Sequence, residues 1–171
     1  MAALKLLVVE DDPASLELMT EMFKQLKAEV RPVQDSRKTS DLIQKVKFDG
    51  IFLDLNMPIL SGFELAKMVR ESACNKSTSM VIVTGRDEKD TMHLSFSLGA
   101  TYFLQKPIDS QKLTPLLQKI QERSIENRRS RTRVPLNTDV ACTVGHKQLN
   151  GVTWNISSGR NPGGSGWSRT R

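Results

Sequence analysis

The sequence of 171 residues predicts an α/β fold, a five-stranded parallel doubly wound sheet with an incomplete β-rich or disordered C-terminal tail. In the first 122 residues, short apolar runs alternate with stretches whose apolar residues recur at helical spacing. Such runs are typical of strands covered on both faces, and βα alternation indicates parallel strands with right-handed crossovers. Beyond residue 122 the alternation stops, which sets the tail apart.

Five strand–helix pairs are expected along the chain. Apolar runs predict strands over residues 4–9, 51–53, 80–83 and 102–104, and a weaker run predicts another over 28–33. The first helix is predicted over 15–26, because Leu16, Met19 and Phe23 share one face at helical spacing. The same spacing predicts the other helices over 39–46, 63–71, 88–98 and 110–121.

Composition excludes a membrane-spanning chain. Apolar residues make up 38% of the sequence, and no apolar run approaches the roughly 20 residues that a membrane helix needs. The first apolar run is short and ends in acids, so no signal peptide is expected and the protein is placed in the cytoplasm. Cys74 and Cys142 lie far apart without a CxxC pattern, which disfavours a disulfide framework or a zinc site.

The net charge of +6 is confined to the tail. Residues 1–122 carry 16 basic and 17 acidic side chains, whereas residues 123–171 carry 9 and 2. The chain therefore divides near residue 122 into a nearly neutral body and a basic appendix.

Polar residues follow four of the predicted strands. In an open parallel sheet, chemistry collects at the carboxyl ends of the strands. The residues found there are Glu10, Asp11, Asp12, Asp54, Thr84 and Lys106. Crowded carboxylates need either a shared proton or a hard divalent cation, and Mg²⁺ is the better match. A solvated acidic loop is the alternative for the first acids.

These polar residues are not equivalent. Asp12 precedes Pro13, a pairing typical of a helix N-cap, which leaves Glu10 and Asp11 as the metal carboxylates of the first strand. Asp54 beside a metal and an ammonium can act as a nucleophile toward phosphorus. Lys106 precedes a proline, and an X-Pro bond that adopts the cis form would direct the lysine side chain into the cleft.

The body is similar to the receiver domain of bacterial two-component response regulators. The resemblance covers about residues 3–122 and rests on four motifs in the right order. The motifs are Val8-Val9-Glu10-Asp11-Asp12, Asp54-Leu55-Asn56-Met57-Pro58 with Ser61-Gly62, Val83-Thr84-Gly85 and Lys106-Pro107. The resemblance implies a flavodoxin-like sheet of order 2-1-3-4-5 and phosphoryl transfer to Asp54 from a histidine kinase or phosphotransfer protein.

The resemblance also implies a set of ligands. Glu10, Asp11, Asp54 and the backbone carbonyl of Asn56 would surround Mg²⁺. Thr84 and Lys106 would contact the phosphoryl group.

A conformational switch is implied as well. Thr84 would move inward on phosphorylation, and Phe103 would rotate into the vacated space. The surface of the fourth helix, fifth strand and fifth helix would then change, and this surface could also form a homodimer. Plain core packing is the alternative for Phe103, because Tyr102 is adjacent. Asn56 and Arg86, each two residues beyond an active-site position, would influence the lifetime of the phosphoryl group.

The basic appendix resembles the beginning of a PilZ domain. Arg129 and Arg133 form an R-x-x-x-R pattern, and Asn155 and Ser157 begin a pattern similar to [DN]-x-S-x-x-G. The resemblance implies binding of cyclic di-GMP through guanidinium contacts to its phosphates and guanines. Arg160 stands where this second pattern requires glycine, so any such domain is incomplete here.

Four segments are therefore expected. They are a receiver domain over 1–122, an Arg-rich linker over 123–133, a partial PilZ-like hairpin over 134–159 and a disordered tail over 160–171. Helical structure is expected to continue through 122–127, and the hairpin strands are expected over 139–144 and 152–156. A longer parent protein with a cyclic di-GMP-binding output is also expected.

Three classes of function remain open. A phosphorylation-driven signalling switch, rather than a turnover enzyme, is favoured. An aspartyl-phosphate phosphotransferase or phosphatase would use the same acidic site, but the short βα loops leave little room for a substrate. A stand-alone receiver whose basic tail binds nucleic acid weakly is the third class. Specific DNA binding is not expected, because no helix-turn-helix pattern follows residue 122.

Overall fold

The computed structural model describes residues 3–85, 89–131, 138–144 and 147–153. The chain forms two compact units, Met1–Ser124 and Ile125–Arg171. Each unit is described by itself below. No helix among the described residues is long and apolar enough to cross a membrane.

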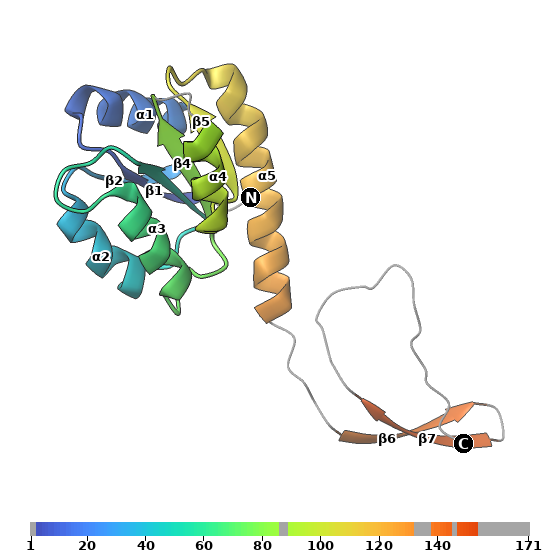
Figure 1. Cartoon of the computed structure of the whole chain (residues 1–171). Helices are drawn as coiled ribbons and strands as arrows, with labels where there is room; N and C mark the ends of the chain where they lie inside the picture. The colour runs from blue at the N-terminus through green and yellow to red at the C-terminus, as the bar shows by residue number, and fades with distance from the viewer. Residues whose placement is uncertain (1–2, 86–88, 132–137, 145–146, 154–171) are drawn as a thin grey trace. The chain divides into compact units, whose positions relative to one another are not determined.

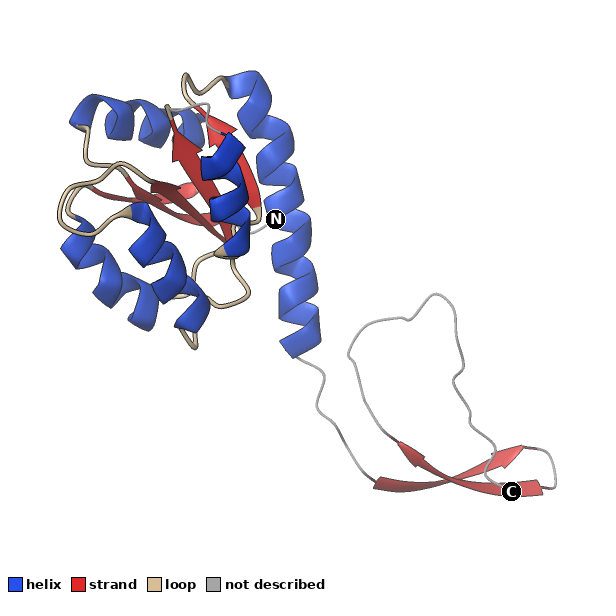
Figure 2. Cartoon of the chain, in the orientation of Figure 1, coloured by secondary structure: helices blue, strands red, loops and turns tan. Residues whose placement is uncertain are grey.

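The first unit is a five-stranded parallel sheet with helices on both faces (Figures 1 and 2). The strand order is β2-β1-β3-β4-β5, which confirms the predicted fold class. The strands are β1 (Lys5–Val9), β2 (Glu29–Val33), β3 (Gly50–Asp54), β4 (Ser79–Thr84) and β5 (Tyr102–Gln105). All residues of β3 and β4 are buried, as expected for runs covered on both faces.

Two apolar clusters fill the space between the sheet and its helices. The helices are α1 (Pro13–Gln25), α2 (Ser36–Lys45), α3 (Gly62–Glu71), α4 (Lys89–Ser97) and α5 (Ser110–Arg131). One cluster joins the sheet to α1 and α5 through residues such as Phe23 and Leu117. The other joins it to α2 and α3 through residues such as Ile43 and Leu65. The sheet is thereby held from both sides, and its carboxyl edge is left open.

Capping side chains set the first residues of two helices earlier than the apolar spacing predicted. The Asp12 carboxylate accepts a hydrogen bond from the backbone N–H of Ser15 at 2.8 Å, so α1 begins at Pro13. This contact confirms Asp12 as an N-cap. Hydrogen bonds from the side chain and the backbone N–H of Ser15 lower the pKa of Asp12. Asp35 caps α2 in the same way through the N–H of Arg37.

The weaker predicted strand, β2, is present at one edge of the sheet. The N–H of Glu29 donates to Leu4, and the carbonyl of Val33 accepts from Glu10, so alternate residues of β2 face β1. Pro32 lies between these positions and points to the open edge, where its missing N–H removes no ladder bond. The proline also blunts this edge against pairing with another chain.

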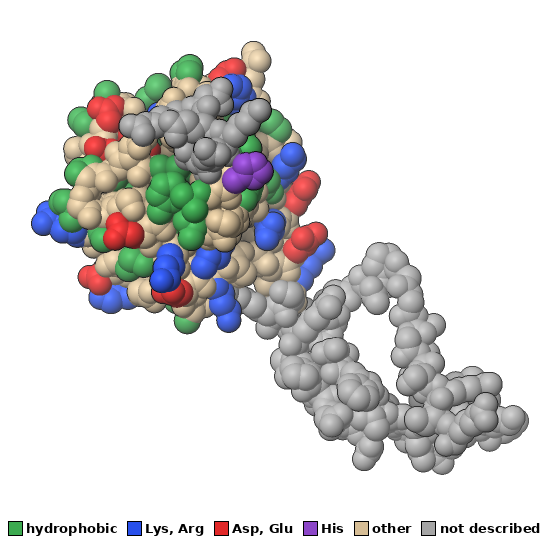
Figure 3. Space-filling model, in the orientation of Figure 1, with side chains coloured by type: hydrophobic (Ala, Val, Ile, Leu, Met, Phe, Trp, Pro, Cys, Tyr) green, Lys and Arg blue, Asp and Glu red, His purple; other side chains and the backbone are tan. Residues whose placement is uncertain are grey.

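Acidic and basic side chains are interspersed over the visible face of the first unit (Figure 3). This mixture agrees with the nearly neutral balance of residues 1–122. The exposed large apolar side chains include three on α4, Met92, Leu94 and Phe96.

A buried polar network holds the amino-terminal edge of the sheet. Asn75 is fully buried, and its Nδ2 donates to the carbonyls of Ile43 and Val46, each at 2.7 Å. Its Oδ1 accepts the N–H of Phe48 at 3.1 Å and the hydroxyl of Thr78 at 3.0 Å. One side chain therefore joins the end of α2, the start of β3 and the start of β4.

The second unit contains an antiparallel pair, β6 (Thr138–Val144) and β7 (Lys147–Thr153). The predicted first strand is confirmed, but the predicted second strand, 152–156, is wrong in its start. Val144 pairs with Lys147, so only two residues connect the strands. Two-residue connections are the commonest between antiparallel neighbours, and this one brings the polar residues after it into the ladder.

Candidate functional site

Three charged side chains from distant parts of the sequence meet at the carboxyl edge of the sheet. Lys106 Nζ lies 2.7 Å from Glu10 Oε2 and 2.7 Å from Asp54 Oδ2. Glu10 follows β1, Asp54 ends β3 and Lys106 follows β5. Glu10 is 1% exposed and Asp54 is 5% exposed, so the lysine is the counter-ion of two nearly buried carboxylates.

Asp11 completes a group of three carboxylates. Ligand atoms of Glu10, Asp11 and Asp54 all lie within 4.8 Å of one another. Oxygen donors at this spacing suit a hard divalent cation such as Mg²⁺. Three carboxylates face one ammonium, so a divalent cation would also balance the local charge.

The protonation of the site follows from its burial. Burial is the main reason why the pKa of Glu10 is raised to about 7. The hydrogen bond from Lys106 lowers this pKa, and the negative charge of Asp54 raises it further. Burial also acts on Asp54, but hydrogen bonds from Lys106 and from the N–H of Asn56 outweigh it and lower the pKa of Asp54. The two carboxylates raise the pKa of Lys106 despite its partial burial. Of the two carboxylates, Asp54 is therefore the one that ionises at the lower pH.

We expect the metal-free protein to lose folding stability as the pH rises between about 5 and 7. The pKa of Glu10 is about 7 in the folded chain against 4.5 for the free side chain. Between these two pKa values, Glu10 keeps its proton in the folded chain but has released it in the unfolded chain. The contribution of this proton to folding stability is lost as the pH rises to the pKa of the folded chain, about 7. The lowered pKa of Asp54 affects folding stability only at pH values near and below 3.8, which is outside this pH range. Thermal unfolding in EDTA across this pH range measures the loss.

Two comparisons control this experiment. Excess Mg²⁺ should restore stability most at the upper end of the range, because a metal ligand must be ionised. The Glu10→Gln variant should lack the slope. A wild-type stability that is independent of pH, or an equal slope in Glu10→Gln, would contradict the expectation.

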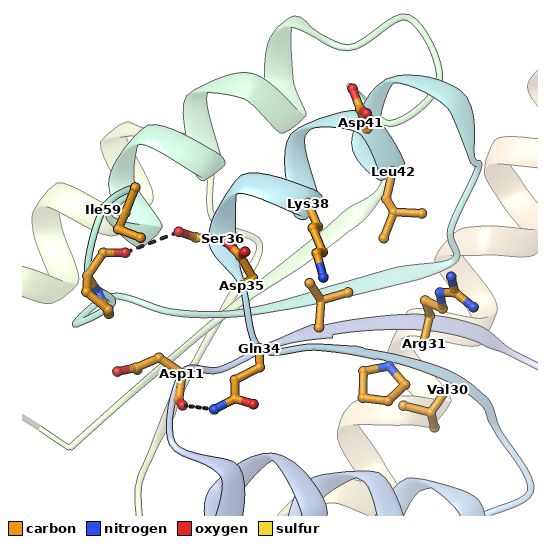
Figure 4. A pocket seen from close by; sticks show the side chains of 13 residues that line it. Asp11, Val30, Arg31, Gln34, Asp35, Ser36, Lys38, Asp41, Leu42 and Ile59 are labelled. Atoms are coloured by element: carbon orange, nitrogen blue, oxygen red, sulfur yellow. Dashed lines mark hydrogen bonds between the residues drawn. The ribbon is translucent and has the colours of Figure 1, made fainter.

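An open groove of about 900 Å³ begins beside Asp11 and runs along β2 and α2 (Figure 4). Within it, Gln34 Nε2 donates to the backbone carbonyl of Asp11 at 3.0 Å, which ties the end of β2 to the acidic loop. The Ser36 hydroxyl donates to the carbonyl of Pro58 at 3.2 Å, which ties α2 to the β3–α3 loop. Both contacts position loops that border the carboxylates.

Gly62 allows α3 to begin directly against the end of β3. A Cβ atom at Gly62 would lie 2.1 Å from the carbonyl oxygen of Asp54 and 2.8 Å from the Cα of Leu55. Both neighbours are backbone atoms, so no side-chain rotation could relieve the clash. The helix start is further secured by a capping box between Ser61 and Glu64.

Ile59 adopts a strained backbone conformation in the β3–α3 loop. Its φ is 75°, and the N–H of Leu60 donates to the carbonyl of Pro58 at 3.0 Å. This is a three-residue γ-turn with positive φ at its centre, which disfavours a β-branched residue. The side chain is 69% exposed, so packing contributes little to offset the strain.

We expect Ile59→Asn to stabilise the fold by about 1 kcal/mol, because asparagine tolerates positive φ. Urea unfolding measures the change. Ile59→Val is the matched control, since valine keeps the β-branch and should give no gain. Equal stability of all three proteins would show that the turn stores no strain.

Thr84 and Phe103 lie on the same face of the sheet. Phe103 is the register partner of Ile82, which is two residues before Thr84 on β4, so all three point to one side. Phe103 is half-buried and packs against the cluster beneath α2 and α3, whereas Tyr102 packs against the opposite cluster. The backbone carbonyl of Thr84 accepts the N–H of Lys106 at 2.8 Å, which joins the ends of β4 and β5.

Some of the remaining predicted residues are described by the structure, and the others lie outside its described ranges. Asn56 is exposed, and its N–H donates to Asp54 Oδ1 at 3.0 Å. The Lys106–Pro107 peptide bond is cis, the form that the sequence left open. Arg129 is exposed on α5. Arg86, Arg133, Asn155, Ser157 and Arg160 lie outside the described residues.

Sequence reasoning missed the parts played by Gln34, Ile59 and Gly62. Gly62 belongs to the second of the four motifs, but nothing in the sequence reveals how closely the start of α3 approaches the Asp54 carbonyl. Gln34 follows a strand end, and that position was a usable signal. The sequence contained no signal for the positive φ of Ile59, because isoleucine is an unusual residue for such a turn.

Comparisons with known proteins agree with this geometry. Residues 6–118 match the response regulator receiver domain family. Stress response regulator protein 1 of Candida albicans is 30% identical over 105 residues, which cover 60% of this chain and 37% of that protein. The cell cycle transcriptional regulator CtrA of Caulobacter vibrioides is 28% identical over 121 residues, covering 71% and 52%. The chain thus spans about a third to a half of the length of these curated relatives.

Among solved structures, the chemotaxis protein CheY4 of Vibrio cholerae superimposes with a TM-score of 0.66 at 30% identity. The match covers 70% of this chain and 99% of that one. The shared part is therefore the sheet with its helices.

Proposed function

This chain belongs to the response regulator receiver domain family, and from that premise we propose that Asp54 accepts a phosphoryl group in two-component signalling. One observation carries the proposal most directly, the position of Lys106 Nζ 2.7 Å from Asp54 Oδ2. An ammonium at this distance keeps the carboxylate ionised and can receive the charge of an incoming phosphoryl group. We propose a histidine kinase or phosphotransfer protein in the cytoplasm as the donor.

In the proposed step, a carboxylate oxygen of Asp54 attacks the phosphorus of a phosphohistidine. A P–O bond forms, the P–N bond breaks, and the released imidazole nitrogen takes up a proton. Asn56 holds one carboxylate oxygen through its N–H at 3.0 Å and Lys106 holds the other. These contacts fix the orientation of the nucleophile.

Glu10, Asp11 and Asp54 are the proposed magnesium ligands, together with the backbone carbonyl of Asn56. Bound Mg²⁺ would neutralise charge on the phosphoryl oxygens during transfer. Glu10 would then need to ionise, which its pKa of about 7 permits near neutral pH.

The proposed output is a change of the surface formed by α4, β5 and α5. Thr84 would contact the new phosphoryl group, and Phe103, on the same face of the sheet, would move toward the vacated position. Met92, Leu94 and Phe96 expose apolar surface on α4. This surface could receive a partner or a second copy of the chain. Arg86 and Asn56 are proposed to influence the lifetime of the acyl phosphate.

Incubation with Mg²⁺ and a small-molecule phosphodonor, followed by intact-mass measurement, tests the proposal. Wild-type protein should gain one phosphoryl mass. Asp54→Asn should gain none, because the amide is a poor nucleophile. The matched control is Asp109→Asn, an exposed acid outside the site. A phosphoryl mass on Asp54→Asn would remove Asp54 from this role.

Lys106→Ala separates phosphorylation from switching. The variant should keep partial phosphorylation, because the acidic ligands are intact. It should lose the downstream change at Phe103, because no ammonium links the phosphoryl group to β5. Phosphoryl mass and the NMR signals of the Phe103 ring report the two effects separately.

For the tail, we propose the division into a linker over 123–133, a partial PilZ-like hairpin over 134–159 and a terminal segment over 160–171. Cyclic di-GMP is the proposed ligand, with Arg129, Arg133, Asn155 and Ser157 as its contacts. The support is the sequence pattern alone. Calorimetry with the dinucleotide should give saturable heat that disappears in Arg129→Ala. Weak binding to nucleic acid that collapses with salt would favour a plain basic tail instead.

A further inference from the structure

Two side chains between β2 and the first turn of α2 hold the two loops that carry the proposed magnesium ligands. Gln34 Nε2 donates to the backbone carbonyl of Asp11 in the β1–α1 loop at 3.0 Å. The Ser36 hydroxyl donates to the carbonyl of Pro58 in the β3–α3 loop at 3.2 Å (Figure 4). Neither side chain is a proposed ligand, but each binds the backbone of a loop that supplies one.

Ser36 fixes the β3–α3 loop at its strained turn. The serine is 3% exposed, and its oxygen also accepts the N–H of Leu60 at 3.3 Å. One hydroxyl thus donates to the residue before Ile59 and accepts from the residue after it, which uses both its donor and an acceptor position. A residue with an unfavourable φ persists only where its surroundings determine the turn. Ser36 is the side chain that does so around the positive φ of Ile59.

The turn held by Ser36 begins two residues after Asn56, whose backbone carbonyl is a proposed ligand. The N–H of Asn56 donates to Asp54 Oδ1 at 3.0 Å, which ties the start of the loop to the proposed phosphoacceptor. Between Asn56 and Pro58, Met57 is buried in the apolar cluster beneath α2 and α3. Because this short segment is fixed on both sides, the Asn56 carbonyl has little freedom to move.

Gln34 holds the acidic loop in a comparable way. The N–H of Glu10 donates to the end of β2 at 3.2 Å, and Gln34 then binds the carbonyl of Asp11. The next residue, Asp12, caps α1 and fixes the far side of this loop. Gln34 is exposed, so water competes for its contact, which therefore contributes less than that of the buried Ser36.

We propose that Ser36 is a positioning residue for the magnesium site, acting through the Asn56 carbonyl, and that Gln34 acts more weakly through Asp11. This inference rests on the proposed function, because it concerns ligands of the same metal. Groups that hold the ligands of a metal fix their orientation, and their loss typically lowers metal affinity about 10- to 100-fold. Because Mg²⁺ demands near-ideal octahedral geometry, a small displacement of one ligand is enough to weaken binding.

A Mg²⁺ titration of the full ¹⁵N-labelled chain, followed by NMR without any phosphodonor, tests the proposal. The amide signals of Asp11, Asn56 and Lys106 should shift in a saturable way and give a dissociation constant. Ser36→Ala should raise this constant about tenfold. Gln34→Ala should raise it about threefold. Because Gln34 is exposed, its variant also decides the question should Ser36→Ala fail to fold.

Ser40→Ala is the matched control on the same helix. The Ser40 hydroxyl donates to the carbonyl of Arg37 within α2 at 3.3 Å, so its removal should leave the dissociation constant unchanged.

The rate of phosphorylation separates positioning from a general loss of structure. In Ser36→Ala, the Mg²⁺ concentration that gives half the maximal rate should rise about tenfold. The rate at saturating Mg²⁺ should stay close to that of the wild type, because Asp54 and Lys106 are unchanged.

Three results would overturn the proposal. Equal dissociation constants in wild type, Ser36→Ala and Gln34→Ala would do so and would leave the proposed function intact. The same holds for a loss in Ser36→Ala that appears only in the rate at saturating Mg²⁺. A wild-type chain that binds no Mg²⁺ would instead contradict the metal site of the proposed function, and this inference with it.

Discussion

Gly62→Ala is expected to destabilise the first unit by about 3 kcal/mol, near the upper end of the cost of overpacking. The new methyl group would meet the Asp54 carbonyl oxygen at 2.1 Å and the Leu55 Cα at 2.8 Å. The start of α3 must then move away from the end of β3. Because this end of β3 carries the proposed phosphoacceptor, phosphorylation should slow together with the loss of stability.

Gly85→Ala is the matched control. A Cβ atom at Gly85 meets nothing within 4 Å, although this glycine also follows a strand at the same edge of the sheet. Its free energy of unfolding should change by less than about 1 kcal/mol. Denaturant unfolding of both variants measures the difference. If the two substitutions have equal effects, the close approach at Gly62 is not the cause.

Asn75→Ala is expected to cost about 3 kcal/mol of folding stability, because several buried groups lose their partner at once. The change removes two bonds of 2.7 Å to the carbonyls of Ile43 and Val46. It also leaves the N–H of Phe48 without its acceptor at 3.1 Å. Amide hydrogen exchange should accelerate first at the start of β3, and denaturant unfolding gives the total loss.

Ser97→Ala is the comparison for this variant. The Ser97 hydroxyl donates to the carbonyl of Leu94 at 2.7 Å, but on an exposed surface where water can replace it. Its removal should change the stability by less than about 0.5 kcal/mol. A loss in Asn75→Ala no larger than that in Ser97→Ala would mean that burial of the network contributes little.

The order of strands and helices and most of the carboxylate site were accessible from the sequence. Apolar runs mark strands covered on both faces, and parallel strands bring their carboxyl ends to one edge. Glu10, Asp54 and Lys106 could therefore be expected to meet although they are distant along the chain. The resemblance to a known family added the strand order 2-1-3-4-5, and the observed sheet confirms it.

Helix starts and the hairpin were less predictable. Apolar spacing places the buried face of a helix, but its first residue depends on which side chain caps the free N–H groups. Asp12 and Asp35 decide this for α1 and α2. In the hairpin, the residues after Val144 are polar and did not predict a strand. The pairing of β6 with β7 depends more on the length of the connection than on the local apolar pattern.

By itself, the sequence determined which residue types reach the carboxyl edge of the sheet, because strand periodicity and chain order are local and repetitive properties. Only the tertiary structure decided how closely backbones approach, as at Gly62, and which groups saturate one another, as at Asn75. It also brought Gln34 and Ser36 against the two loops that carry the proposed metal ligands. Such arrangements depend on distances between segments far apart in the chain, and packing sets those distances only after the elements have formed.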